Sequence, residues 1–445
     1  MNIHELTEKI NTERSTTIFS GLYGESEAGN ARQRYQKLIT EMRETWTKED
    51  VRVFSAPGRT ELAGNHTDHN LGKVLAASIQ LDNTAIVQKR NDNVVFFRST
   101  GFPDVNITLT DKNGNPDLSS KPEERGTTEA LIRGIAAELC RRGCNVGGFS
   151  ANADSTVLAG SGLSSSAALE TLLGRIFDSL YGEGKRSPLE IAQIGQIAEN
   201  NYFGKPCGLM DQAACAAGGA IAIDFADTAC PEIKQVYFDP AAAGFSLCVL
   251  NTGGSHADLT ADYASIPQEM KKVAAFFGKT ALGELKKDTV MSRAADVRKE
   301  CGDRALLRSL HFFDENARVD AMTVSLMEMD AAVDGSAQQR AFSQYLELVN
   351  ESGGSSWQLL QNVYSPNRPE IQSMGVALAL TKDFFRVQKL RGACRVHGGG
   401  FAGTIQVYIP ADAMNAYRSY IEAVFGAGSV TVLRIRPIGA VELLW

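Results

Sequence analysis

The stretch GRTELAGNHTDHN, residues 58–70, places two histidines, an aspartate, an arginine and a glutamate close together in the chain. Such a group can hold a metal ion, form part of a catalytic loop, or make a polar surface turn. A zinc ion would use His66, Asp68 and His69 as its ligands. The local composition leaves all three interpretations open, and the rest of the chain must decide among them.

A second candidate is the glycine- and serine-rich stretch LAGSGLSSSAA at residues 158–168. Apolar residues follow it at helical spacing, so its serines stand at the start of an amphipathic helix. The first N–H groups of a helix have no internal partners, and small residues let a ligand approach them. A phosphate satisfies these groups with the help of the helix dipole. The pattern therefore favours an anion site over a flexible turn with a serine cap.

Asp211 and the motif HGGGFAG at residues 397–403 are further candidates. Asp211 follows a glycine-bounded segment, where a carboxylate can be catalytic, although an ordinary helix N-cap is the simpler local interpretation. HGGGFAG matches a dinucleotide-binding pattern, but a strand rather than a helix follows it. FFGKTALG fails as a Walker A loop because Val273 stands where a glycine is needed. We expect HGGGFAG to be a tight turn between strands, at a place where a ligand comes close.

The elements that position these residues mix strand and helix patterns without regular βαβ repetition, which favours an α+β fold. Residues 51–57 alternate apolar and polar side chains until Pro57-Gly58, so we expect this strand to stop there and residues 58–70 to be a loop. Residues 187–204 form a predicted helix with Ser187 and Glu190 as a capping box. Further strands are predicted at residues 74–90, 93–100, 220–225, 244–254, 404–410 and 429–445. Further helices are predicted at residues 31–46, 127–142, 165–177, 265–277 and 338–350.

Bulk composition narrows the class of protein. A chain of 445 residues predicts two domains, which we place at residues 1–235 and 236–445. The net charge of −7 argues against a nucleic-acid or anionic membrane surface. The polar N-terminus and the lack of a long apolar run predict a cytoplasmic protein without a membrane span. The eight scattered cysteines are expected to be reduced.

Three motifs, taken in order, resemble the galactokinase branch of the galactokinase, homoserine kinase, mevalonate kinase and phosphomevalonate kinase (GHMP) superfamily. GNHTDH is similar to its sugar signature, GLSSSAA to its phosphate loop and GGGFAG to its third glycine-rich motif. The resemblance extends from about Val51 to the C-terminus. It implies a two-domain α+β fold with the active cleft between the domains. It also implies phosphorylation of the anomeric hydroxyl of galactose to galactose 1-phosphate by ATP and Mg²⁺, in a protein that we expect to be a monomer.

The resemblance also implies roles for individual residues. Arg59 and Asp211 would be the catalytic pair, in which Asp211 accepts the proton or orients the hydroxyl and Arg59 keeps it ionised. Ser166 and Glu199 would hold Mg²⁺, a cation that prefers oxygen ligands. The residues expected at the sugar are Asn65, His66, Asp68, Gly208 and Tyr263. Those expected at the phosphates are Gly160, Ser161, Gly162, Leu163, Ser164, Ser165 and Ser166. The opening stretch would then be a sugar-binding loop and not a zinc site.

The opening stretch departs from the family signature G-R-x-N-L-I-G-E-H-T-D-Y-N. Glu61 replaces the asparagine, Asn65 replaces the glutamate and His69 replaces the tyrosine. The family glutamate is expected to accept a hydrogen bond from the C6 hydroxyl of the sugar, and Asn65 offers an acceptor without charge. This loss also removes a repulsion against a carboxylate at C6. Galactose remains the expected substrate, and galacturonate, arabinose or N-acetylgalactosamine is the alternative.

A protein of another class, a non-catalytic galactose and ATP sensor, would also share these motifs. Such a sensor would be expected to have lost its phosphate loop or its catalytic pair. GLSSSAA, Arg59, Glu199 and Asp211 are all present. The sequence therefore favours an enzyme.

Overall fold

The computed structural model describes residues 1–45, 50–157, 162–254 and 259–445. The strands are β1 (Val51–Ala63), β2 (Lys73–Lys89), β3 (Val94–Ser99), β4 (Val105–Thr108), β5 (Phe149–Ser155), β6 (Ala220–Asp224), β7 (Glu232–Val236), β8 (Phe245–Asn251), β9 (Ala393–His397), β10 (Thr404–Pro410), β11 (Val430–Leu433) and β12 (Val441–Leu443). The α-helices are α1 (Ile3–Lys9), α2 (Glu13–Tyr23), α3 (Ala28–Thr45), α4 (Thr128–Arg141), α5 (Ser165–Tyr181), α6 (Pro188–Ala198), α7 (Met210–Ala217), α8 (Thr260–Phe276), α9 (Lys287–Met291), α10 (Ala294–Cys301), α11 (Asp303–Ala331), α12 (Gly335–Ser355), α13 (Ser373–Val387) and α14 (Met414–Phe425).

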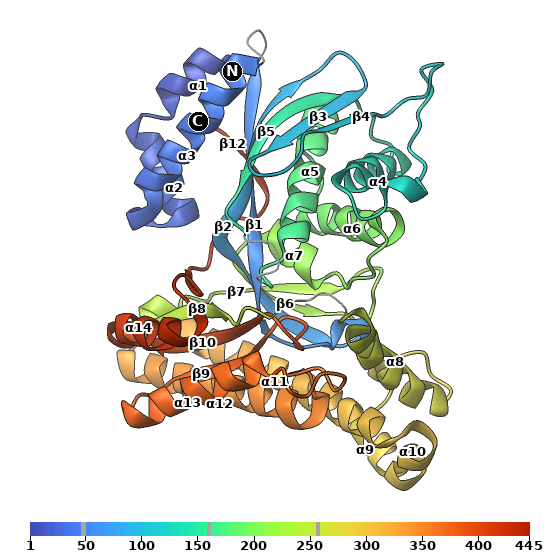
Figure 1. Cartoon of the computed structure of the whole chain (residues 1–445), viewed down its shortest axis with the longest axis vertical. Helices are drawn as coiled ribbons and strands as arrows, with labels where there is room; N and C mark the ends of the chain where they lie inside the picture. The colour runs from blue at the N-terminus through green and yellow to red at the C-terminus, as the bar shows by residue number, and fades with distance from the viewer. Residues whose placement is uncertain (46–49, 158–161, 255–258) are drawn as a thin grey trace.

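The strands form two mixed or antiparallel sheets, so the predicted α+β class is confirmed. The larger sheet has the order β12-β1-β2-β5-β3-β4, with β6 paired to β2 and β7 paired to β6. The smaller sheet has the order β11-β8-β10-β9. Helices α1–α3 lie on one side of the larger sheet and α4–α7 on the other, and α11–α14 lie with the smaller sheet (Figure 1).

Both faces of the central strands are buried, and alternate residues of β1 serve different cores. Val51 and Val53 pack with the N-terminal helices. Phe54 and Ala56 pack with α4 and α5 on the opposite face. Because successive side chains of a strand point to opposite faces, one strand contributes to both layers. The N-terminal helices are thus a full layer of the fold.

Strand β1 continues through Pro57-Gly58, so the prediction that it stops there is wrong. Pro57 pairs with Asp82 of β2, but Arg59 pairs with Ser78. Gly58 alone therefore lies opposite three residues of β2. The extra residues of this bulge belong to β2, and a bulge of this kind bends the paired strands. A Cβ on Gly58 would stand 2.7 Å from the carbonyl oxygen of Leu163, so only glycine fits. The predicted loop begins at Gly64 instead of residue 58.

The last strand returns to the first part of the chain. β12 pairs antiparallel with β1, and residues such as Leu443 and Val53 are register partners. Ile435 forms an isolated bridge with Ile79 of β2. The C-terminus consequently lies beside the N-terminal helices (Figure 1).

Several local predictions are confirmed. Ser187 and Glu190 form the capping box of α6, with Pro188 in its first turn. The HGGGFAG motif lies between β9 and β10, as a turn between strands. All eight cysteines lie in described residues and are free thiols. Among the residues that the structure describes, no helix is long and apolar enough to cross a membrane.

Candidate active site

Arg59, which directly follows the register shift at Gly58, contacts Asp211. The Arg59 Nε donates a 2.8 Å hydrogen bond to Oδ1 of Asp211, and its Nη1 donates to the carbonyl oxygen of Gly162. The Arg59 backbone N–H donates to Leu163 O at 3.1 Å. Burial opposes the charge of Arg59, but Asp211 and Glu61 outweigh it and raise the pKa of the guanidinium. Arg59 is therefore hydrogen-bonded both to Asp211 and to Gly162 at the start of the serine-rich segment.

Asp211 is the second residue of α7, whose N-cap position is Leu209, so the N-cap interpretation is wrong. Its Oδ2 accepts a hydrogen bond from the hydroxyl of Ser164. Burial raises the pKa of Asp211, but Arg59 and the Ser164 hydroxyl outweigh burial and hold it below its ordinary value of 3.8. The side chain is 33% exposed, so a substrate can still reach it. Asp211 is an ionised, oriented carboxylate.

The serine-rich segment opens α5 as predicted. Gly160 and Ser161 lie outside the described residues. Gly162 has φ +71°, and a Cβ there would stand 2.8 Å from the Thr404 hydroxyl, so a larger residue would clash. Ser164 takes the left-handed φ of +60° at the N-cap position and makes no capping hydrogen bond. The first N–H groups of α5 are therefore left for a ligand.

Ser166 and Glu199 also lie together. The Ser166 hydroxyl donates a 3.1 Å hydrogen bond to Oε1 of Glu199, and Lys205 Nζ contacts the same oxygen at 3.0 Å. Glu199 begins a π-helical turn (Glu199–Phe203) that follows α6 directly. Its carboxylate is almost fully buried, and the oxygen atoms of Glu199 and Ser166 lie beside the exposed cationic side chain of Lys205. Oxygen atoms of this kind suit Mg²⁺.

Gln212 holds this acidic group from behind. Its Nε2 donates 2.9 Å hydrogen bonds to Oε2 of Glu199 and to Oε2 of Glu170. Burial and the neighbouring Glu199 raise the pKa of Glu170 well above its ordinary value. The sequence analysis missed Gln212 and Lys205. The signal for Gln212 was its place next to Asp211, whereas Lys205 stood out only as part of a helix-ending segment.

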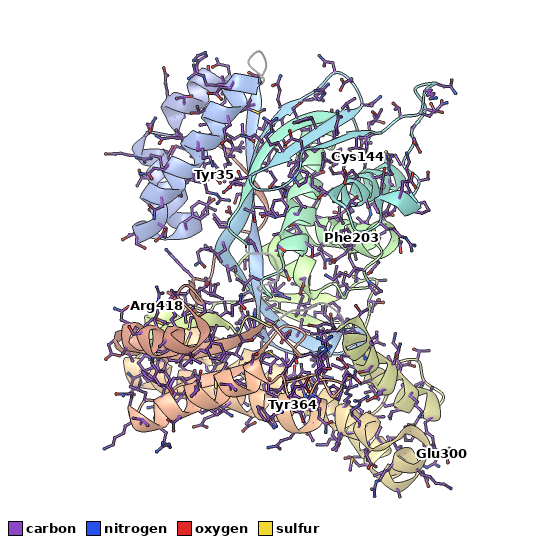
Figure 2. All side chains as sticks on the ribbon, viewed as in Figure 1. Tyr35, Cys144, Phe203, Glu300, Tyr364 and Arg418 are labelled. Atoms are coloured by element: carbon purple, nitrogen blue, oxygen red, sulfur yellow. The ribbon has the colours of Figure 1, made fainter. Side chains whose placement is uncertain are left out.

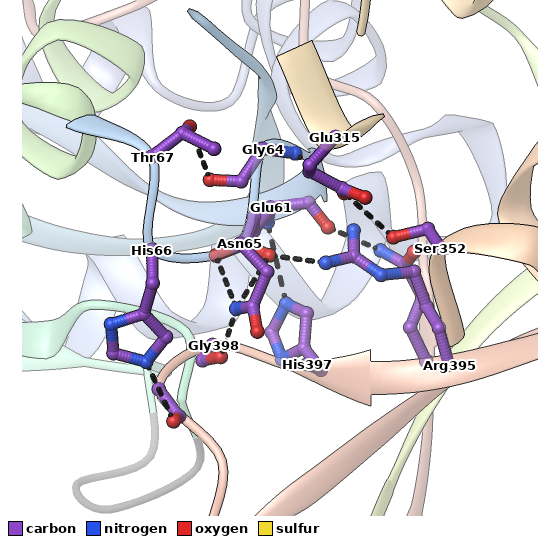
Figure 3. Close-up of polar contacts among 12 residues, drawn as sticks. Glu61, Gly64, Asn65, His66, Thr67, Glu315, Ser352, Arg395, His397 and Gly398 are labelled. Carbon is purple, nitrogen blue, oxygen red and sulfur yellow. Dashed lines mark hydrogen bonds and ion pairs between the residues drawn. The ribbon is translucent and has the colours of Figure 1, made fainter. Parts of the chain in front are cut away.

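The side chain of Asn65 lies inside the protein (Figure 3). It is 1% exposed, and its Nδ2 donates to Gly398 O at 2.6 Å and to Oε1 of Glu61 at 3.1 Å. Its Oδ1 accepts from Asn362 Nδ2 at 2.8 Å. Both ends of the amide are thus bonded to protein groups. The acceptor that the sequence analysis assigned to the sugar, Oδ1 of Asn65, is bonded to Asn362 in this structure.

His66 and Tyr263 bond to the same glycine turn. His66 Nε2 lies 2.9 Å from Gly399 O, and the Tyr263 hydroxyl donates to Gly400 O at 2.9 Å. Because a carbonyl only accepts, His66 carries its proton on Nε2. Burial lowers the pKa of His66 to about 3, so the ring is neutral. Three consecutive carbonyl groups of the turn therefore each bond to a residue that the sequence assigned to the sugar.

Asp68 and Gly208 are also brought together. A Cβ on Gly208 would stand 1.8 Å from Oδ2 of Asp68, so the carboxylate lies directly against this glycine. The other Asp68 oxygen accepts a 2.9 Å hydrogen bond from the backbone N–H of His69. The rings of His66 and His69 stand 6.0 Å apart. The loop therefore places the Asp68 carboxylate against Gly208, shortly before α7.

The carboxylate of Glu61, also in the signature, is buried. It pairs with Arg395 of β9, whose side chain is fully buried, and Figure 3 shows this contact behind Asn65. Burial opposes the charge of Arg395, but Glu61 and Glu315 outweigh it and raise the pKa of Arg395. Glu315 in turn accepts from the Gly64 N–H at 3.1 Å and from Ser352. The sugar-signature loop is therefore supported by buried charged side chains.

Comparison with known proteins agrees with this geometry. The profile of the GHMP kinases N terminal domain matches residues 130–219, and that of the galactokinase galactose-binding signature matches residues 42–89. A galactokinase of Streptomyces coelicolor is 31% identical over 417 residues, which cover 93% of this chain and 96% of that protein. The chain belongs to the galactokinase family.

Another galactokinase and two solved structures are also similar to this chain. A galactokinase of Glaesserella parasuis is 29% identical over 82% of this chain and 87% of its own length. The crystal structure of Lactococcus lactis galactokinase complexed with galactose superimposes with a TM-score of 0.75 at 25% identity, covering 92% of this chain and all of that one. A Methanococcus jannaschii mevalonate kinase shares the fold, with a TM-score of 0.59 at 12% identity over 87% of this chain and 98% of that one.

Proposed function

We propose that this protein transfers the γ-phosphoryl group of ATP to the anomeric hydroxyl of galactose, giving galactose 1-phosphate. The observation that carries the proposal is the Arg59–Asp211 pair, held at the open N-terminus of α5 in a chain of the galactokinase family. A carboxylate, a guanidinium and free helix N–H groups are the parts that phosphoryl transfer to an alcohol needs.

In this proposal Asp211 orients the C1 hydroxyl of the sugar and accepts its proton as the new P–O bond forms. The low pKa of Asp211 keeps it ionised at neutral pH, so it is ready to accept a hydrogen bond from the hydroxyl. Arg59 offsets negative charge on the transferring group while it fixes Asp211. The phosphates rest on the segment of residues 160–166 that precedes and opens α5.

Mg²⁺ would be held by Ser166 and Glu199. Their oxygen atoms lie 3.1 Å apart and are of the kind that this cation prefers. When bound, the ion supplies positive charge to the phosphates. Gln212 fixes the second oxygen of Glu199, and Lys205 must share or leave the first when the cation binds.

For the sugar, we assign direct contacts to Asp68 and the backbone of Gly208. Asp68 keeps one oxygen against Gly208, and its side chain is 11% exposed. We assign His66 and Tyr263, which both bond to the glycine turn, to the same sugar site. Asn65 acts through the turn, because both ends of its amide are already bonded.

The wider assignments follow the same proposal. Residues 1–235 and 236–445 are the two domains, with the active cleft between them, and β12 is a strand that the second part returns to the first sheet. We take the protein to be a monomer that works in the cytoplasm, where ATP is available.

The test is a coupled ADP-release assay with Mg-ATP against galactose, galacturonate, arabinose, N-acetylgalactosamine and glucose. The reaction without sugar serves as the blank. Galactose with the highest kcat/KM is the expected result. A higher kcat/KM for galacturonate, arabinose or N-acetylgalactosamine would replace galactose as the substrate. ADP release from no sugar would contradict the kinase itself.

A further inference from the structure

Asp82 lies at a buried junction on β2, opposite Pro57 of β1. Its side chain is fully buried, and Oδ1 accepts a 2.6 Å hydrogen bond from Arg34 Nη1 of α3. Oδ2 accepts from the Tyr23 hydroxyl at 2.7 Å, from Ser55 and from Arg436 at 3.3 Å. Burial raises the pKa of Asp82, but the two arginines outweigh burial and lower it. The carboxylate is therefore an ionised acceptor that joins the N-terminal helices to the C-terminal segment.

The same junction also bonds to residues at the end of β5. Arg34 Nε pairs with Asp154, and Arg34 Nη2 donates to Asp154 O at 2.8 Å. Thr156 exchanges two 2.9 Å hydrogen bonds with the backbone of Asp82. Two residues after Thr156 the chain enters the segment that leads to the predicted phosphate stretch. The junction thus fixes the backbone from which that stretch departs.

The junction also closes the bulge that carries Arg59. Asp82 is the register partner of Pro57 and so marks the end of the bulge on β2. At the other end Arg59 pairs with Ser78, whose carbonyl accepts a 3.0 Å hydrogen bond from the Arg436 N–H. Residues of β2 between these two ends are covered by the C-terminal segment, as in the bridge of Ile79 to Ile435. Arg436 therefore contacts both ends of the bulge.

We propose that Asp82, together with Arg34 and Arg436, is a positioning centre for catalysis: it holds the bulge so that Arg59 reaches Asp211 and Gly162, and it holds the end of β5 that leads to the phosphate stretch. This inference rests on the proposed function for the roles of Arg59 and the phosphate stretch. Asp82, Arg34 and Arg436 are not themselves placed at the reacting groups. Each acts by holding the backbone of β1, β2 or the end of β5, which in turn positions Arg59 and the phosphate stretch. The N-terminal helices, through Arg34, are then part of the catalytic apparatus.

A plain alternative is that Arg34 only docks the helices. Docking already has a large apolar contact, since residues of α1–α3 such as Phe19 and Tyr35 pack against Val53 and Ile86 of the sheet. Figure 2 labels Tyr35 in this layer, beside the sheet. Because this apolar contact already holds the helices on the sheet, docking alone does not account for the buried polar groups around Asp82. The two readings differ in which kinetic constants respond when Arg34 is changed.

The experiment compares Arg34→Met with Arg32→Met in the full-length enzyme, using whichever sugar the wild type phosphorylates best. Arg32 lies on the same helix, and within the described part of the chain its hydrogen bonds go to Thr12 and Thr16 of the N-terminal segment. We expect Arg34→Met to lower kcat by about tenfold to a hundredfold and to raise KM for ATP, because small misplacements of reacting groups cost this much. Affinity for that same sugar without nucleotide, measured by calorimetry, should stay within about twofold because none of the residues assigned to the sugar is changed. Arg32→Met should match the wild type in all three quantities.

Altered melting temperature with wild-type kcat and KM for ATP in Arg34→Met would overturn the inference and leave only docking. Should Arg34→Met fail to fold, Thr156→Val removes the hydroxyl that bonds to Asp82 N–H and keeps the side-chain shape. It should raise KM for ATP by about threefold to tenfold, and an unchanged KM for ATP would equally overturn the inference. Because the sugar is chosen from the wild-type panel, failure of the galactose assignment leaves this comparison intact.

Discussion

The side-chain amide of Asn65 donates a 2.6 Å hydrogen bond to the carbonyl oxygen of Gly398, 333 residues further along the chain. This bond joins the sugar signature to the turn between β9 and β10. The same amide donates to Glu61, where the family signature has asparagine at position 61 and glutamate at position 65. The carboxylate and the amide have therefore exchanged places within one contacting pair.

The exchange predicts strong coupling between Glu61 and Asn65. Asn65→Glu alone brings two carboxylates together, and Glu61→Asn alone leaves the buried Arg395 without its partner, which costs about 3–5 kcal/mol. The double variant Glu61→Asn/Asn65→Glu restores one carboxylate and one amide, so we expect it to be more stable and more active than either single variant. Urea unfolding and kcat/KM for galactose measure this, with a coupling energy of at least about 1 kcal/mol. Additive effects would contradict the exchange.

Arg59→Lys should be severely impaired. Lysine keeps the charge but cannot donate at once to Asp211 and to the carbonyl of Gly162. We expect kcat to fall by about a hundredfold or more, because a preorganised charged donor is lost. Steady-state kinetics check this, with circular dichroism to show that the variant is folded. Activity close to that of the wild type would remove Arg59 from the catalytic pair.

Asp211→Asn separates proton transfer from positioning. The amide keeps the shape and one acceptor but cannot take a proton near neutral pH. If Asp211 is the base, kcat should fall by about a hundredfold to ten-thousandfold with little change in galactose affinity. Single-turnover kinetics and calorimetry measure the two quantities. A rate within about tenfold of wild type would show that the carboxylate only orients the hydroxyl.

Ser164→Ala should change the pH profile. The Ser164 hydroxyl helps to hold the pKa of Asp211 below its ordinary value, so its removal raises that pKa. Activity requires ionised Asp211 and is lost as pH falls through its pKa. The acid limb of kcat/KM should therefore move to higher pH in Ser164→Ala. Ser165→Ala is the matched control and should leave the limb in place, and an unmoved limb in Ser164→Ala would contradict the contact with Asp211.

Gln212→Leu should weaken Mg²⁺ activation. Without the amide, the buried carboxyl groups of Glu199 and Glu170 lose their shared donor, and Glu199 loses its fixed orientation. Partners that orient metal ligands contribute about tenfold to a hundredfold in metal affinity, so the Mg²⁺ concentration for half-maximal activity should rise by about this factor. Gln196→Leu removes an amide that bonds to Cys207 O and should have no such effect. Equal Mg²⁺ curves for Gln212→Leu and wild type would contradict the role of Gln212.

Local patterns predicted most elements because they depend on neighbouring residues. The capping box of α6 and the strand character of β2 needed nothing beyond periodicity and cap chemistry. The bulge at Gly58 was missed because it depends on the approach of Leu163, more than a hundred residues away. Pro57-Gly58 is an ordinary strand-ending signal until that contact is known. The true end of β1 could therefore not be predicted from the sequence alone.

Side-chain roles were predicted less completely than side-chain positions. The motifs placed Arg59 with Asp211 and Ser166 with Glu199, and the structure brings both pairs into contact. The sequence could not show that Ser164 bonds to Asp211 instead of pointing freely to a ligand. That depends on the left-handed conformation of Ser164, which a serine adopts only when the surrounding fold imposes it.

The pairing of β12 with β1 affects how the chain is made on the ribosome. Until residues 441–443 emerge, β1 has an open edge with unpaired N–H and C=O groups along Val53–Ser55. Arg59 lies further along β1, and its register partner Ser78 accepts the hydrogen bond from the Arg436 N–H only when residue 436 is in place. A nascent chain can thus form its N-terminal helices and most of the larger sheet early, whereas the edge of β1 and the register shift beside Arg59 are completed only when residues 436–443 join them. Nascent chains that lack residues 436–443 should therefore be compact, exposed at one strand edge and inactive.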